Sequence, residues 1–252
     1  MNAAAAGSTK ATLISHLLEL RTRLLRMAVG MVVVFVPCAI YADELFTTLS
    51  KPLLAALPDG SSMVATGVMT SFTAPFKLSF YVSIAIAMPY LLWEIWGFVA
   101  PGLYRGEKRF AVPLVVSSIV LFYSGMAFAY FLLFPSVFKF LVATTPTGVK
   151  MMTDINEYVG FAMTMFLAFG LSFEVPIVVI LMVLTGLIGI EKLTASRGYV
   201  IVAIFIVSAV LTPTTDAISQ LAMAGPMWLL FEVGVIAARL MVKAKKPVEG
   251  AT

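Results

Sequence analysis

The sequence predicts an all-α integral membrane protein, in which six transmembrane helices, kinked by proline, form a concave bundle with both termini in the cytoplasm. Three observations predict it: the composition, the length of the apolar runs and the placement of basic residues. Hydrophobic residues make up 61% of the 252 residues and charged residues 12%, whereas soluble domains have about 45–50% and about 25%. A soluble fold could not hide this much apolar surface, so a soluble enzyme, a disordered regulator and a nucleic-acid binder are excluded.

Six runs are apolar enough for membrane helices, which need about 20 mostly apolar residues. We expect one six-span membrane domain over residues 1–252, with spans at about 24–41, 76–98, 113–141, 158–187, 198–211 and 217–240. The fifth run is short for a crossing, and only residues 212–216 separate it from the sixth. These two spans should therefore form a tight antiparallel hairpin.

Most of the 17 basic residues fall on one side of this arrangement. They precede span one, lie between spans two and three and between four and five, or follow span six: Lys10, Arg21, Arg23, Arg26; Arg105, Lys108, Arg109; Lys192, Arg197; Arg239, Lys243, Lys245 and Lys246. The positive-inside rule places that side, and with it both termini, in the cytoplasm.

Five prolines lie inside the predicted spans, and each removes a hydrogen-bond donor and frees the carbonyl four residues earlier. The prolines are Pro37, Pro89, Pro135, Pro176 and Pro226. The freed carbonyls are those of Val33, Ala85, Phe131, Ser172 and Ala222. Bent helices around a concave surface would follow, although prolines are also common in membrane helices without any such role.

The two outer loops differ from the inner ones. Residues 43–70 contain an apolar stretch broken by Pro52, Pro58 and Gly60, which predicts short helices lying across the membrane face. Residues 144–157 are rich in Thr, Pro and Gly. No internal or inverted repeat divides the chain.

Three acids lie within spans. Glu174 is near the middle of span four, where a carboxylate costs several kcal/mol; it is either a functional group at a wet cavity or a neutral acid bonded to a neighbouring helix. Glu94 and Glu232 lie near the cytoplasmic ends of spans two and six, where they could reach headgroups or pair with Arg105 and Arg239.

Glu19 and Glu107 are isolated carboxylates on the basic cytoplasmic face. Each could form a specific pocket for a guanidinium, which pairs with a carboxylate in a bidentate fork. Each could equally pair locally, Glu19 with Arg23 one helical turn away. Leucines at helical spacing across residues 12–25 predict an amphipathic surface helix that runs into span one.

The sequence carries no cofactor or metal motif. His16 is the one histidine and Cys38 the one cysteine, so neither has a partner ligand or a disulfide. The HExxH, GxSxG and P-loop motifs are also missing, so an intramembrane enzyme and an ATPase are disfavoured.

Four stretches of the sequence resemble the TatC family, the large subunit of the twin-arginine protein translocase. They are residues 16–24 (HLLELRTRL), residues 98–104 (FVAPGLY) with Glu107 and Arg109, residues 169–176 (FGLSFEVP) and residues 211–213 (LTP). They occur in the family's order over about residues 12–241.

The resemblance implies a bacterial inner-membrane protein that recognises signal peptides with two consecutive arginines. With the single-span subunits TatA and TatB, such proteins move folded precursors across the membrane using the proton gradient, as homo-oligomers in a receptor complex. It implies that Glu19 and Glu107 bind the arginine pair, and that Arg21, Phe98 and Leu103 contribute to recognition.

The resemblance also assigns four further positions. Glu174 matches the family's intramembrane acid, and Pro52 matches a proline of the first outer loop. Thr212 and Gln220 fall on a polar patch for docking the single-span partners. An extra residue in the turn at 212–216 shifts the register of that patch, and Glu94 has no family role.

A proton-coupled secondary transporter, with Glu174 as its coupling site, is the strongest alternative function. It conflicts with the missing inverted repeat and with the lack of a polar track through the other spans.

Overall fold

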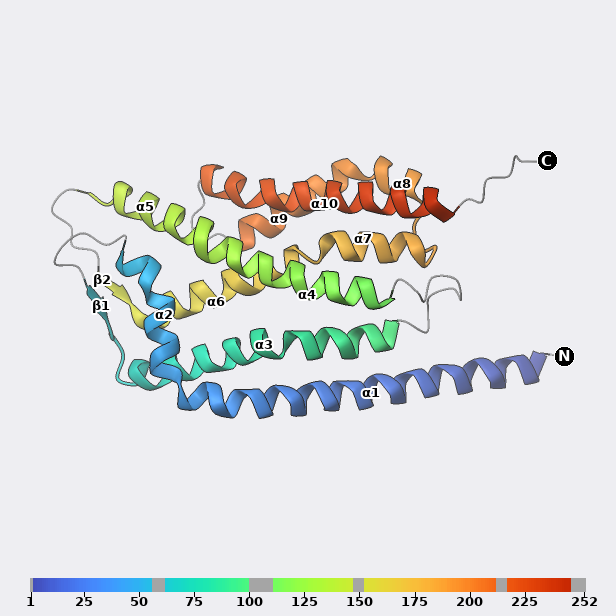
Figure 1. The fold of residues 1–252 in the computed structure, drawn as a ribbon, viewed down its shortest axis with the longest axis horizontal. Helices are drawn as coiled ribbons and strands as arrows, with labels where there is room; N and C mark the ends of the chain where they lie inside the picture. The colour runs from blue at the N-terminus through green and yellow to red at the C-terminus, as the bar shows by residue number, and fades with distance from the viewer. Residues whose placement is uncertain (1, 56–61, 100–110, 147–151, 212–216, 246–252) are drawn as a thin grey trace.

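The computed structural model describes residues 2–55, 62–99, 111–146, 152–211 and 217–245. The long helices run side by side along one axis (Figure 1). The elements are α1 (Asn2–Ile40), α2 (Ala42–Leu54), β1 (Ser62–Val64), α3 (Thr70–Val99), α4 (Ala111–Phe128), the π-helix η3 (Ala129–Leu133), α5 (Phe134–Thr144), β2 (Met152–Asp154), α6 (Ile155–Ser172), α7 (Val175–Leu184), α8 (Ile190–Ala195), α9 (Arg197–Leu211) and α10 (Ala217–Lys245). We call the end where α1 begins and α10 finishes the terminal end, and the opposite one the sheet end.

Within these residues, five helical stretches are long and apolar enough to cross a membrane. They are Ser15–Ile40, Thr70–Val99, Val112–Thr144, Ile155–Leu184 and Met223–Val242. They correspond to the first four predicted spans and the sixth. The fifth predicted span is also helical, but its apolar part, Arg197–Val210, is shorter. An all-helical membrane protein is therefore confirmed, and a sixth crossing stays a prediction.

The first helix differs from the expected surface segment followed by a span. α1 is one uninterrupted helix that packs along α3. No proline precedes Pro37 in it, so nothing in the backbone forces a change of direction at the predicted boundary. Leu17 and Leu24, two of the leucines that suggested amphipathicity, are 64% and 52% exposed.

The α6–α7 span forms the centre of the bundle. Of its most apolar stretch 50% is buried, whereas only 6% of the corresponding stretch of the α1 span is buried. α6 ends at Ser172, and Pro176 lies at the start of α7. Because Pro176 has no N–H to donate to the Ser172 carbonyl, the helix is interrupted, and Phe173 and Glu174 form a turn between the two helices. α4 lies very close to α6, because a Cβ at Gly125 would overlap the backbone carbonyl of Phe169.

The two predicted outer loops meet at the sheet end through a pair of strands, which the sequence does not predict. β1 and β2 pair in parallel, with Ser62 opposite Met152 and Val64 opposite Asp154. Of the short helices expected over residues 43–70, the described part of that stretch contains α2, and the strand β1 follows it where no strand was expected.

Asp154 fixes the junction between this sheet and the α6 helix. One carboxylate oxygen caps α6 by accepting from the backbone N–H groups of Asn156 and Glu157, at 2.8 and 3.2 Å. The other accepts from the backbone N–H and hydroxyl of Thr66. The hydrogen bonds from Thr66 are the main reason why the pKa of Asp154 falls from 3.8 to about 2.

Tyrosine hydroxyls take up carbonyls that prolines leave free. Pro52 lies in α2 and cannot donate to the Thr48 carbonyl, which accepts from the Tyr130 hydroxyl at 3.0 Å. Pro89 leaves the Ala85 carbonyl free, and the Tyr123 hydroxyl donates to it at 3.0 Å. Since lipid offers no donor, such bonds keep proline-containing helices satisfied while tying them to a neighbour.

The bond from Tyr130 should stabilise the protein only because Pro52 has no N–H. Tyr130→Phe should lower the free energy of unfolding by about 1–3 kcal/mol in the native background. In a Pro52→Ala background the backbone N–H can serve Thr48, so the same change should cost less than half as much. Equilibrium unfolding in detergent measures this double-mutant cycle.

Tyr158→Phe is the matched control. Its hydroxyl donates to the Leu49 carbonyl at 2.6 Å, and the residue four positions later in α2 is Leu53, which has an N–H whether residue 52 is proline or not. Its effect should be equal in both backgrounds. If Tyr130→Phe also has equal effects in both, the link to Pro52 is wrong.

The contribution of the Asp154 carboxylate to stability should depend on pH in one direction. Its folded-state pKa is lowered, so its contribution is complete above about pH 4 and disappears as the pH falls toward 2. The unfolding temperature of the wild type should exceed that of Asp154→Asn by a constant margin from pH 8 to 5, and the margin should shrink below pH 4. A margin that grows on acidification would contradict the assignment.

Candidate functional site

Three charged side chains meet where α1 passes the last turns of α3, near the terminal end. We call Glu19, Arg23 and Glu94 the Glu19 cluster. Arg23 lies 2.8 Å from Glu19 and 3.0 Å from Glu94, measured between Nη2 and Oε1 and between Nη1 and Oε2. The side chains are progressively buried: Glu19 is 38% exposed, Arg23 20% and Glu94 9%. With two acids and one base, the cluster carries one net negative charge, and the more exposed acid is Glu19.

Backbone contacts bind Arg23 to α3 as well. Its guanidinium donates to the carbonyls of Glu94 at 3.3 Å and Gly97 at 3.0 Å. One turn before Glu19, the ring of His16 stacks on Phe98, with centroids 4.2 Å apart and planes 22° from parallel. The end of α3 and the start of the α1 span are thus held together by an aromatic pair beside an ionic one.

Of the five residues predicted for signal binding, the structure brings Glu19 and Phe98 to this region. Arg21 lies two positions from both Glu19 and Arg23 on the helix, so it faces away, and its side chain is exposed. Leu103 and Glu107 lie outside the described residues.

The local alternative for Glu19 is observed, since it pairs with Arg23 at i,i+4. Glu94 pairs with Arg23 on a different helix, and Arg105, its suggested partner, lies outside the described residues. The pairing of Glu232 with Arg239 is wrong. Arg197 of α9 binds Glu232 of α10 at 2.6 Å, while Arg239 donates to the Thr194 hydroxyl at 2.8 Å.

Glu174 lies at the break between α6 and α7 and has an unsatisfied atom. Its Oε1 is buried and has no hydrogen-bond partner among the described residues. The nearby polar group is the fully buried hydroxyl of Ser118 on α4, which accepts from the Trp96 indole at 3.4 Å. An acid in such surroundings requires either a proton or an additional partner.

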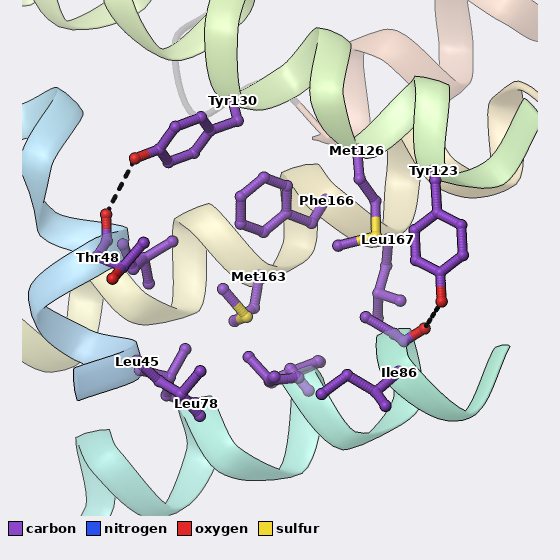
Figure 2. A pocket seen from close by; sticks show the side chains of 14 residues that line it. Leu45, Thr48, Leu78, Ile86, Tyr123, Met126, Tyr130, Met163, Phe166 and Leu167 are labelled. Atoms are coloured by element: carbon purple, nitrogen blue, oxygen red, sulfur yellow. Dashed lines mark hydrogen bonds between the residues drawn. The ribbon is translucent and has the colours of Figure 1, made fainter. Parts of the chain in front are cut away.

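A cavity of about 430 Å³ lies between α2, α3, α4, η3 and α6, on the sheet side of that break. Figure 2 shows Met126, Met163 and Phe166 pointing into it, while the hydroxyls of Tyr123 and Tyr130 turn outward to their carbonyl partners. Its wall is therefore almost entirely apolar, and Glu174 is not among its lining residues.

The remaining predicted positions lie apart from the Glu19 cluster. Pro52 is on α2, at the sheet end. Gln220 joins α9 to α10, because its amide donates to the Phe205 carbonyl at 3.1 Å and its own carbonyl accepts from the Ser208 hydroxyl at 2.9 Å. Thr212 lies outside the described residues.

Arg23, Glu94 and Gly97 were not predicted from the sequence to be parts of one site. A usable signal was present: an acid inside an apolar span needs a cation, and a basic residue at the matching depth of the neighbouring span can supply it. The described residues contain no group of three metal-ligating side chains.

Comparison with known proteins agrees with this architecture. The family model described as Sec-independent protein translocase protein (TatC) matches residues 15–226. The chain is 51% identical to the TatC protein of Azotobacter chroococcum mcd 1 over 223 aligned residues. These make up 88% of this chain and 87% of the relative. It is 46% identical over 230 residues to TatC of Escherichia coli strain K12, covering 91% and 89%.

A solved structure has the same fold. The crystal structure of a protein named Twin Arginine Translocase Receptor- TatC superposes with a TM-score of 0.80 at 32% identity, covering 90% of this chain and 99% of that one. Proteins of this family are components of a membrane protein translocase and not catalytic enzymes. This chain belongs to the TatC family of Sec-independent protein translocase proteins.

Proposed function

We propose that this chain is the twin-arginine signal-peptide receptor and core subunit of a translocase that exports folded proteins, driven by the proton gradient. The observation that carries the proposal is the Glu19 cluster, which has a net negative charge and a partly exposed carboxylate at the terminal end. A guanidinium is the ligand that matches such a group best, because it forms charge-assisted hydrogen bonds with a carboxylate.

The proposed topology places six spans in the bacterial inner membrane, within a single domain and with both termini in the cytoplasm. Two observations support it. α1 begins and α10 finishes at the same end of the bundle (Figure 1). The basic residues Arg197 and Arg239 lie with them, as the positive-inside rule requires for a cytoplasmic face.

In this proposal the two arginines of a precursor bind Glu19 and Glu107, with Arg21, Phe98 and Leu103 around them. The hydrophobic stretch of the signal adds affinity by lying against the apolar cavity of Figure 2 or the surrounding bilayer. A proton-coupled transporter is not proposed, since the family consists of translocase proteins.

Loss of either acid should weaken binding of a twin-arginine signal peptide. Glu19→Ala or Glu107→Ala should raise the dissociation constant roughly tenfold, the equivalent of one charge-assisted hydrogen bond. A twin-lysine peptide should bind the wild type poorly, because an ammonium cannot form the same fork. Fluorescence titration against the protein in nanodiscs measures both effects.

Glu191→Ala is the matched control, since Glu191 is an acid of the short helix α8, which lies at the same end. It should bind like the wild type. Unchanged affinity in both Glu19→Ala and Glu107→Ala would show that the arginines bind elsewhere.

We further propose that TatA and TatB dock along α9 and α10, near Thr212 and Gln220, and that copies of this chain associate in the receptor complex. Support comes from polar groups that join two apolar helices, because Gln220 and Ser208 each donate a hydrogen bond to a backbone carbonyl of the other helix. Glu174 and Pro52 keep their proposed roles as functional intramembrane acid and outer structural proline.

Cysteine crosslinking maps this contact. A cysteine at Leu221 or Val210, which are 57% and 79% exposed, should crosslink to the spans of TatA or TatB. A cysteine at Val32, 56% exposed on α1, is the control on a different face and should give little product. Crosslinks confined to α1 would place the partner on the other side of the bundle.

A further inference from the structure

Arg23 binds Glu19 in a way that uses only half of the carboxylate. Its Nε and Nη2 both donate to Oε1, at 3.0 and 2.8 Å. No described residue donates to the second oxygen, Oε2, and the Glu19 side chain is 38% exposed. The pairing therefore fixes the direction of the carboxylate and leaves Oε2 without a donor among the residues that the structure describes.

Arg23 can orient Glu19 because residues of α3 hold its guanidinium in place. Its Nη1 donates to Glu94 Oε2 at 3.0 Å, and its Nη2 also donates to the Gly97 carbonyl at 3.0 Å. Gly97 makes room for this approach. A Cβ there would overlap Nη1 and lie 3.0 Å from Cζ of Arg23, so any larger residue would displace the guanidinium.

We propose that Arg23 is a positioning residue for ligand recognition: held by Glu94 and by the backbone at Gly97, it orients Glu19 so that Oε2 accepts from a guanidinium of the signal peptide. The inference rests on the proposed function of Glu19. The new element is that α3 takes part in recognition, because its contacts to Arg23 fix the orientation of Glu19. Glu94 supplies the second negative charge, which leaves the cluster with one net negative charge.

The opposite role for the same contact makes a contrary prediction. If Arg23 were a competitor that blocks Glu19, displacing it would free both carboxylate oxygens and tighten ligand binding. If Arg23 orients Glu19, displacing it weakens binding and reduces the preference for arginine over lysine, since an ammonium depends less on the direction of its acceptor. The sign of the change separates the two.

Gly97→Ala tests this without altering any charge. We expect it to weaken binding of a twin-arginine peptide about tenfold and to lower the ratio of twin-arginine to twin-lysine affinity. Arg23→Lys, which keeps the charge but loses the fork, should act in the same way. Gly160→Ala is the control, because a Cβ at that glycine of α6 meets no atom within 4 Å, and it should leave both affinities unchanged.

Glu94→Gln separates charge from geometry. It removes the net negative charge of the cluster but leaves the backbone carbonyls of Glu94 and Gly97 as acceptors for Arg23. Twin-arginine and twin-lysine affinities should therefore fall together, with their ratio kept. If Glu94→Gln instead lowers the ratio of twin-arginine to twin-lysine affinity as Gly97→Ala does, the assignment of charge to Glu94 and of orientation to Arg23 is wrong.

Failure of this inference can be told apart from failure of the proposed function. If Glu19→Ala weakens binding while Gly97→Ala and Arg23→Lys keep the wild-type affinity and arginine preference, Glu19 is the receptor but Arg23 does not position it. Tighter binding in Gly97→Ala would also reject the inference. Unfolding temperatures of all variants show whether a loss of affinity reflects loss of the fold.

Discussion

The hydrocarbon interior of a bilayer supplies no hydrogen-bond partner, and this constraint explains how the proline-containing helices and the buried charges of the molecule are joined to their neighbours. Each backbone carbonyl that a helix cannot satisfy must find a donor elsewhere in the protein. Pro52 and Pro89 each leave one carbonyl open, and a tyrosine of another helix takes it. The hydroxyls thereby become links between α2, α3 and the α4–η3 segment, and the cavity of Figure 2 lies between these links with an apolar wall.

The same constraint restricts where charges can lie. Glu94 is nearly buried and requires a cation, which Arg23 provides from the neighbouring helix. Arg23 also pairs with Glu19. The cation that neutralises the buried Glu94 of α3 therefore also fixes the position of the partly exposed Glu19 carboxylate on α1. The cluster then has one acid in excess at the end of the bundle. That imbalance, together with TatC family membership, is the reason why we propose a receptor for a cationic segment.

Local sequence rules predict the helices and the freed carbonyls, but not the partners. The apolar runs place every long helix, and the proline rule identifies the Ala85 carbonyl as open. Which hydroxyl reaches that carbonyl depends on how α4 crosses α3, and a one-dimensional pattern does not contain this. The parallel pairing of β1 with β2, and the bonds between Thr66 and Asp154 across 88 positions, depend on the assembled bundle in the same way. Glu19 is recognisable from its motif, whereas Arg23 and Gly97 gain meaning only once α1 lies against α3.

Site-specific photocrosslinking tests the central claim most directly. A photoreactive residue is placed at position 98, beside the cluster, in the full-length protein in membrane vesicles, and a twin-arginine precursor is added. The account predicts a crosslink that disappears when the two arginines are replaced by lysines, and none from position 199, an 83% exposed site on α9. Equal crosslinking from both positions, or from both precursors, would contradict it.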